Sequence, residues 1–378
     1  MNRQLVVALL AFATVFAGVP APAAAAVDQT AQQQTAQCTF PMTVTDATGT
    51  EVTITDDPER VVTTNPSAAQ TMWELGARDE VVGVSQYAMY LDGASEKGNV
   101  SGSGGLNVEA VIGLEPDLVL VPNSSYNAAP DRVGQLRSAD ISVVVFESGK
   151  SLAAVANKTE RVGRMTGNCE AGVERAAEMR ESMEHMREAL DGAERPVGLN
   201  SFFGYTSGSE TFISDIMTTA GLRNGAAEAN LTGFAQINEE LVVEMNPEYI
   251  VVPDHAPVPS SPAYNSTTAI QEGNVIVIEA HKLQQPAPRA IEASEEILEA
   301  VHPDAYERYQ QLENESATDS TADETETTTA ADTTATDAAE STATTESADS
   351  TTESDAPGFG VVAGLAAIGA VVLLARRR

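Results

Sequence analysis

The chain has 378 residues, of which 55 are acidic and 21 basic, giving a formal net charge of −34. This balance excludes a nucleic-acid partner, because binding to a phosphate backbone relies on clustered lysine and arginine. It is typical of a surface kept soluble in concentrated salt, where screening removes the self-repulsion of like charges.

The first 26 residues have the pattern of a secretory signal peptide. Arg3 precedes an apolar run at 5–19, and alanine-rich small residues follow at 21–26. The run is shorter than the roughly 20 residues that a membrane-spanning helix needs. We therefore expect residues 1–26 to direct export and to be removed.

Two further features fit an exported chain. Cys38 and Cys169 are the only cysteines, and an even pair outside the cell predicts a disulfide, with two buried thiols as the alternative. Asn-x-Ser/Thr sequences make candidate glycosylation sites; they begin at Asn99, Asn123, Asn157, Asn230, Asn265 and Asn314.

The middle of the chain alternates short β-branched runs with helical patterns, which predicts an α/β fold of strands and crossover helices. In a first lobe at 40–150, we expect strands at 60–63, 81–84, 117–121 and 141–146, and helices at 67–76, 107–114 and 131–139. In a second lobe at 194–312, we expect strands at 197–199, 249–252 and 275–278, and helices at 209–220, 239–245 and 286–301.

A linker at 151–193 contains the longest helical pattern. Its apolar residues recur at steps of three and four; they are Val173, Ala176, Met179, Met183, Met186 and Leu190. Gly192 and Pro196 end the pattern. A helix of about 20 residues is about 30 Å long, enough to join two lobes. The methionine stripe is interpreted as core packing in preference to a ligand site.

The C-terminal part has a different composition. Residues 313–356 are rich in Ser, Thr, Asp and Glu, which predicts a disordered stalk. Pro357-Gly358-Phe359, an apolar run to residue 375 and three arginines at 376–378 complete the chain. This run is just long enough to span a bilayer, with the arginines on the cytoplasmic side.

A series of short motifs runs along the body of the chain. Residues 60–67 (RVVTTNPS), 74–77 (ELGA) and 81–84 (VVGV) are followed by 107–110 (NVEA), 115–119 (EPDLV), 246–251 (NPEYIV), 273–278 (GNVIVI) and Pro288-Arg289. This set, covering about 40–309, resembles the class III periplasmic binding proteins, which are cobalamin and iron-siderophore receptors of ABC importers. The C-terminus resembles the PGF-CTERM sorting signal of haloarchaeal surface proteins, whose span an archaeosortase replaces with a lipid. A plain transmembrane anchor is the alternative.

The resemblance implies two Rossmann-like lobes joined by one long backbone helix. It also implies a monomeric receptor outside the cell that delivers a ligand to an ABC permease and its ATPase. A corrinoid is preferred over a ferric siderophore or haem, and a surface protein without a transport role remains the alternative from another class.

Ligands of such folds bind at the carboxyl ends of the strands, so the residues after each strand are the binding candidates. They are Pro66, Ser67, Tyr87, Tyr90, Asn123, Tyr126, Phe203, Tyr205, Asp254 and Arg289. Aromatic faces suit a large rigid macrocycle, although half of the rings, Phe202 or Phe203 among them, are expected to pack under their own loops. Ser67 has a second interpretation, as a capping box with Gln70.

In the family, a glutamate on each lobe pairs with the permease. Glu240 matches the second-lobe position. The first-lobe position holds Gln70, and Glu74 could substitute for it.

Catalysis and resident cofactors are not expected. The histidines His185, His255, His281 and His302 are scattered, unlike the convergent ligands of a metal site. No Gly-x-Ser-x-Gly elbow or Gly-Lys-Ser/Thr phosphate loop occurs. The glycine-rich segment at 101–105 follows no predicted strand and is interpreted as a flexible loop.

Overall fold

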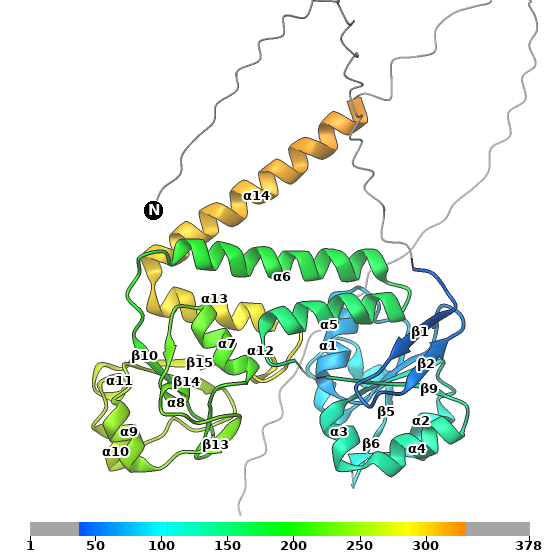
Figure 1. The fold of residues 1–378 in the computed structure, drawn as a ribbon, viewed down its shortest axis with the longest axis horizontal. Helices are drawn as coiled ribbons and strands as arrows, with labels where there is room; N and C mark the ends of the chain where they lie inside the picture. Colours follow the sequence, from blue (N-terminus) through cyan, green and yellow to red (C-terminus); the bar gives the residue numbers. More distant parts are fainter. Residues whose placement is uncertain (1–37, 104, 148, 330–378) are drawn as a thin grey trace, which may run out of the picture. The chain divides into compact units, whose positions relative to one another are not determined.

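The computed structural model describes residues 38–103, 105–147 and 149–329 (Figure 1). The predicted signal peptide, the predicted anchor at 357–378 and the part of the predicted stalk beyond residue 329 lie outside these residues.

The first lobe is built on a parallel sheet in the order β5-β4-β3-β8-β9. Its strands β3 (Val61–Thr63) and β8 (Leu118–Pro122) are buried along their whole length, as expected for parallel strands covered on both faces. The other elements confirm the predicted alternation of strand and helix. They are β1 (Met42–Thr45), β2 (Glu51–Ile54), β4 (Val81–Val84), β5 (Gly98–Asn99), β6 (Ser101–Gly102), β7 (Gly105–Leu106), β9 (Ser142–Phe146), α1 (Pro66–Glu74), η1 (Gln86–Ala88), η2 (Ala94–Glu96), α2 (Val108–Gly113), α3 (Asn123–Ala128) and α4 (Pro130–Ser138).

The second lobe has its own parallel sheet, in the order β12-β10-β14-β15. Strand β14 (Tyr249–Pro253) pairs with β10 (Val197–Asn200) on one side and β15 (Val275–Ile278) on the other. Other elements are β11 (Tyr205–Ser207), β12 (Arg223–Asn224), β13 (Phe234–Gln236), α7 (Phe212–Thr219), α8 (Gly225–Glu228), α9 (Glu239–Met245), α10 (Pro262–Asn265), α11 (Thr268–Glu272), α12 (Ala280–Leu283) and α13 (Ala290–Val301). The predicted α/β class is therefore confirmed in both halves.

The long connecting helix predicted from the methionine stripe is α6 (Cys169–Ala189), which reaches across both lobes (Figure 1). It is packed against a second helix, α5 (Leu152–Met165), that the sequence analysis missed. Met165 belongs to the core of the first lobe, whereas Leu152 and Met186 belong to the core of the second. The lobes are thus joined by a helical hairpin, and the methionine stripe is core.

The prediction of a disordered stalk at 313–356 is wrong for its first part. Helix α14 (Pro303–Thr329) continues through residues 313–329, which were expected to be disordered. The helix begins on a packed turn, since Ala305 and Tyr309 are buried in the core of the second lobe. A formed turn removes the nucleation cost, so the helix continues into 313–329 although this segment is rich in threonine, a poor helix former.

The start of α1 corrects the capping-box interpretation. Asn65 is the N-cap, and its side-chain oxygen accepts the backbone N–H of Ala68 at 3.3 Å. Pro66 occupies the first helical position, where its missing N–H costs nothing. Ser67 and Gln70 therefore lie inside the helix, and neither caps it.

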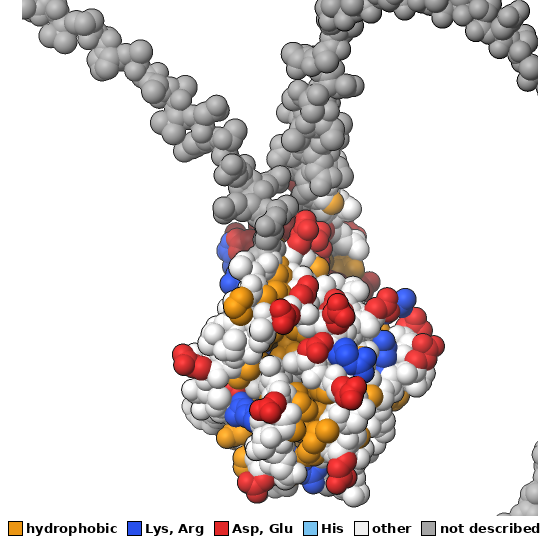
Figure 2. Space-filling model, turned by 90° about the vertical axis from the view of Figure 1, so that its right-hand side faces the viewer, with side chains coloured by type: hydrophobic (Ala, Val, Ile, Leu, Met, Phe, Trp, Pro, Cys, Tyr) orange, Lys and Arg blue, Asp and Glu red, His pale blue; other side chains and the backbone are white. Residues whose placement is uncertain are grey.

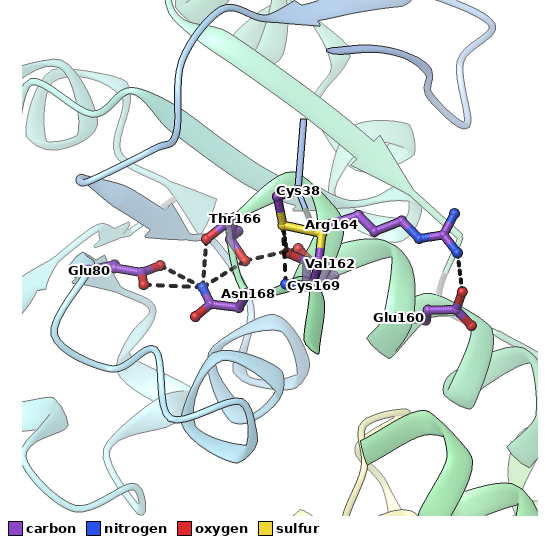
Figure 3. Close-up of a disulfide and its surroundings, with 9 residues drawn as sticks. Cys38, Glu80, Glu160, Val162, Arg164, Thr166, Asn168 and Cys169 are labelled. Carbon is purple, nitrogen blue, oxygen red and sulfur yellow. Dashed lines mark hydrogen bonds and ion pairs between the residues drawn. A yellow bond between two sulfur atoms is a disulfide. The ribbon is translucent and has the colours of Figure 1, made fainter. Parts of the chain in front are cut away.

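The two cysteines form the predicted disulfide, with their Cα atoms 5.5 Å apart (Figure 3). Cys38 begins the described chain and Cys169 begins α6. Asn168 beside it donates to the Glu80 carboxylate at 3.0 and 3.1 Å, which ties the same turn to the loop before β4. Gly163 and Gly172 face each other here, because a Cβ on Gly163 would lie 2.8 Å from the Gly172 Cα.

The negative charge is dispersed. Figure 2 looks onto the first-lobe side and shows acidic side chains spread over that face, fewer basic ones, and hydrophobic side chains exposed between them. Among the described residues, no helix has the length and apolarity to cross a bilayer.

Candidate ligand-binding site

The carboxyl edge of the first sheet carries a cavity of about 580 Å³. Its walls come from the ends of β3 and β4 and from the β6–β7 hairpin, and they include Pro66 and Tyr87 of the predicted set. The Tyr87 ring is 68% exposed. The first lobe thus offers an open hollow with an aromatic rim.

The interpretation of residues 101–105 as a flexible loop is wrong. The described residues of this segment follow β5 and belong to strands β6 and β7, in which Ser101 pairs with Leu106. The Ser101 hydroxyl accepts the backbone N–H of Gln86 at 2.9 Å, which joins the hairpin to the loop that bears Tyr87. A two-residue strand such as β5 leaves too short a pattern to be recognised in sequence.

The carboxyl edge of the second sheet carries a group of aromatic rings that we call the aromatic patch. Its members form two sets of ring contacts, one of Phe202 with Tyr205 and Phe234, and one of Phe203 with His255. Phe203 is 59% exposed and Phe234 57%. Phe202 lies at the centre, 6.1 Å from the Tyr205 ring and 6.0 Å from the Phe234 ring between centroids. Exposed apolar groups gathered in this way mark a binding surface.

A tight turn presents the aromatic patch. Phe202 and Tyr205 exchange both backbone hydrogen bonds, at 3.0 and 2.9 Å, across Phe203 and Gly204. Both central residues have positive φ, 50° and 82°, which is the signature of a type I′ hairpin. This conformation is uncommon for a bulky residue and holds the Phe203 ring outward.

Residues predicted to bind ligand or permease meet instead between the lobes, in what we call the interlobe network. The fully buried Gln70 donates to the Tyr90 hydroxyl and to the His281 carbonyl, each at 2.9 Å, and accepts the Arg289 backbone N–H at 3.1 Å. The Tyr90 and His281 rings stack at 4.8 Å. Burial raises the pKa of Tyr90 to about 12, so its hydroxyl keeps its proton.

Glu74 completes this network. Its carboxylate lies 2.7 Å from the Arg289 guanidinium and 3.4 Å from that of Arg175 on α6. The docking prediction for Gln70 is wrong, since a side chain without exposed surface cannot meet a partner protein. Glu74 is paired twice and 17% exposed, and Arg289 is engaged by it; the docking role of Glu74 and the ligand role of Arg289 stay predictions.

Four other predicted residues have local roles in the structure. Ser67 is buried, and its hydroxyl accepts from the Asn65 amide at 2.6 Å. Tyr126 packs against the outer core of its lobe and faces a separate hollow beside α4. Asn123 donates to the Glu147 carboxylate at 3.2 Å, and Asp254 accepts the Ala280 backbone N–H at 3.0 Å. Ser67 and Tyr126 are therefore structural, whereas Asp254 still lies at the carboxyl edge of its sheet.

The remaining predicted positions lie on the surface. Glu240 is exposed in the first turn of α9, which Asn238 caps. Of the candidate glycosylation sites, Asn99, Asn157, Asn230, Asn265 and Asn314 are exposed and Asn123 is half-buried. In the described part of the chain, no group of three or more His, Cys, Asp or Glu side chains is placed to hold a metal ion.

Phe234 and His255 were missed as binding candidates. Phe234 lies on β13, which pairs with β11 in an antiparallel ribbon that has no signal in the strand pattern. His255 lies two residues after β14, in the candidate loop from which Asp254 was selected, but it was not itself selected.

Two family models match the chain. The model described as "Periplasmic binding protein" matches residues 61–281, and that of the PGF-CTERM motif matches residues 356–378.

A curated relative is the "Cobalamin-binding protein" of Halobacterium salinarum. It is 42% identical over 313 residues, which cover 79% of this chain and 83% of the relative. Among solved structures, the periplasmic heme-binding protein RhuT of Roseiflexus sp. RS-1 has a TM-score of 0.59 at 24% identity, covering 65% of this chain and 99% of that one. The periplasmic vitamin B12 binding protein BtuF of Vibrio cholerae has a TM-score of 0.57 at 22% identity, covering 66% and 98%. At these identities, the two solved structures establish the fold alone.

Proposed function

The chain belongs to the periplasmic binding protein family, and from that premise we propose that it captures a corrinoid and delivers it to the permease of an ABC importer. The family consists of solute-binding proteins. The PGF-CTERM motif anchors the chain by its C-terminus at the archaeal cell surface. The Halobacterium relative is a cobalamin-binding protein, which supports cobalamin as the corrinoid.

The observation that carries the proposal is the kind of side chain at the carboxyl edges of the two sheets: among the described residues, aromatic rings are exposed there, and free basic groups are not. The basic residues near these edges are engaged by protein groups. Arg132 donates to the carbonyl of Leu106 in the wall of the first-lobe cavity, and Lys282 and Arg289 are ion-paired. The Lys282 ammonium lies 2.7 Å from Glu296, 3.2 Å from Glu292 and 3.4 Å from Glu279. Arg289 is paired with Glu74. A corrin ring surrounded by neutral amides suits such surfaces better than haem or an anionic ferric siderophore, which need free cations.

We place the corrinoid between the first-lobe cavity and the aromatic patch, with Tyr87 on one side and Phe203 on the other. The interlobe network holds the two lobes together, because its hydrogen bonds and ion pair cross between them, and we therefore expect the lobes to move little on binding. A largely pre-formed site loses less ordering entropy on binding. Glu240 stays our candidate for contact with the permease, because it is exposed on the second lobe and belongs to neither the patch nor the network.

We expect Phe203→Ala and Tyr87→Ala each to weaken cyanocobalamin binding by about five- to 150-fold. Loss of one aromatic contact corresponds to about 1–3 kcal/mol of apolar burial. Equilibrium titration of the purified protein in molar salt measures the change. Val243→Ala is the matched control, because Val243 is also an exposed apolar side chain, 52% accessible, but lies on α9. Unchanged affinity in both aromatic variants would remove the aromatic surfaces from the site.

A further inference from the structure

The four histidines differ sharply in their surroundings. His185 is 14% exposed, with Nδ1 2.9 Å from Glu313. His302 is hydrogen-bonded to the Gly221 carbonyl at 3.3 Å. His281 is 22% exposed, stacks on Tyr90 and has Nε2 3.8 Å from Glu279. His255 alone among them is open to solvent, with a side chain 48% exposed.

His255 also lies in the aromatic patch. It follows the end of β14, and its ring centroid is 5.6 Å from that of Phe203. Strand β14 is paired with β10, whose end leads to the turn that carries Phe203. An exposed imidazole thus lies at the carboxyl edge where a macrocycle would rest its face.

A neighbouring carboxylate lies beside one nitrogen of the ring. The His255 Nδ1 atom is 3.7 Å from Asp254 Oδ1, and the Ala280 backbone N–H holds that same oxygen at 3.0 Å. The Asp254 backbone N–H in turn donates to the Ile278 carbonyl at 2.8 Å. With Nδ1 beside this carboxylate, Nε2 is the ring nitrogen on the far side, and it is the one left to meet a metal.

We propose that His255 Nε2 binds the cobalt of a corrinoid whose axial position holds exchangeable water. This inference rests on the proposed function and refines its substrate class. In the step, the bond from cobalt to water breaks and a bond from cobalt to Nε2 forms. Water leaves as a neutral molecule, the Nδ1 proton stays in place and the oxidation state of cobalt does not change. Imidazole nitrogen is a suitable ligand for such a transition metal.

The proposal makes the receptor selective among corrinoids. Cyanocobalamin, whose axial position is closed by cyanide, would bind through the aromatic surfaces alone. Aquacobalamin would gain the bond to His255 in addition. Asp254 is a positioning residue in this account, since it acts through the orientation of the imidazole.

The test is a titration of the purified full chain with aquacobalamin and with cyanocobalamin, followed by visible absorption and by equilibrium affinity. With aquacobalamin, we expect the spectrum to change to that of an imidazole-ligated corrinoid. In His255→Ala, we expect no such change, and an affinity for aquacobalamin lowered by about 10- to 100-fold more than the affinity for cyanocobalamin, which loses only a ring contact. Phe203→Ala is the control, because it should weaken both corrinoids while keeping the spectral change at saturation.

Persistence of the spectral change in His255→Ala would overturn the proposal, as would an unchanged spectrum when aquacobalamin saturates the wild type. If cyanocobalamin binds and only the spectral result fails, the proposed corrinoid function stands without the cobalt contact. If neither corrinoid binds, both fail.

Discussion

Replacing Cys38 and Cys169 together by serine is expected to lower the free energy of unfolding by about 3–5 kcal/mol. The disulfide closes a loop with a sequence separation of 131 residues, so its loss frees many conformations of the unfolded chain. It also releases the start of the folded body from α6. For a body of this size, the melting temperature should fall by roughly 10 °C.

Thermal unfolding in molar salt, with and without reductant, measures this effect. Reductant should lower the stability of the wild type to that of the double variant and leave the variant unchanged. Equal melting temperatures for the wild type and the variant would contradict the account.

A second large effect is expected for Asp46→Ala, which should cost about 3–5 kcal/mol because it leaves a cationic partner unpaired. The Asp46 side chain is 0% exposed, and its Oδ2 lies 2.5 Å from the Arg137 guanidinium. Its Oδ1 accepts backbone N–H groups of Thr48 and Thr50, at 2.8 and 3.1 Å, while Oδ2 accepts that of Val145 at 3.1 Å. One carboxylate thus holds the β1–β2 hairpin to β9 and α4.

The contribution of Asp46 should depend on pH. Burial alone would raise the pKa of its carboxyl, but hydrogen bonds from Thr48, Val145 and Thr50 outweigh it and lower the pKa below the ordinary value of 3.8. The unfolded chain therefore takes up the proton first as pH falls, and the stabilisation is present above about pH 4 and lost below it.

Chemical unfolding at pH 7 and pH 3 should show the difference between wild type and Asp46→Ala shrinking at the lower pH. Asp79→Ala is the control, since Asp79 is 94% exposed and its pairing with Arg78 is a surface contact of little stabilising effect. A difference that stays constant with pH would refute the role given to the carboxylate.

The sequence predicted the strands and α6 well because burial leaves a regular pattern in them. Val119, Val143 and Val251 lie in strands covered on both faces, and Met179 and Met186 mark the inner face of one helix. Helix α5 carries a similar stripe in Leu152, Val155 and Val162, so its omission was a missed signal. The continuation of α14 into the stalk could not be predicted from the sequence pattern, because it depends on the packing of Tyr309 at the preceding turn.

The site was only partly predictable, for a different reason. The rule that ligands bind after strands found Tyr87, Phe203 and Tyr205, which the structure leaves exposed at the carboxyl edges. It also selected Arg289, and Gln70 was selected by analogy with the family. Gln70 and Arg289 are 219 residues apart and meet only because two lobes pack together. A contact of that range leaves no local pattern in a single sequence.

The central claim, that this receptor binds a corrinoid, is tested most directly by equilibrium titration of the purified protein with cyanocobalamin in molar salt. We predict saturable binding of one corrinoid per chain, with no competition from haem or a ferric siderophore. Failure to bind cyanocobalamin or aquacobalamin, while haem or a ferric siderophore binds saturably, would contradict it.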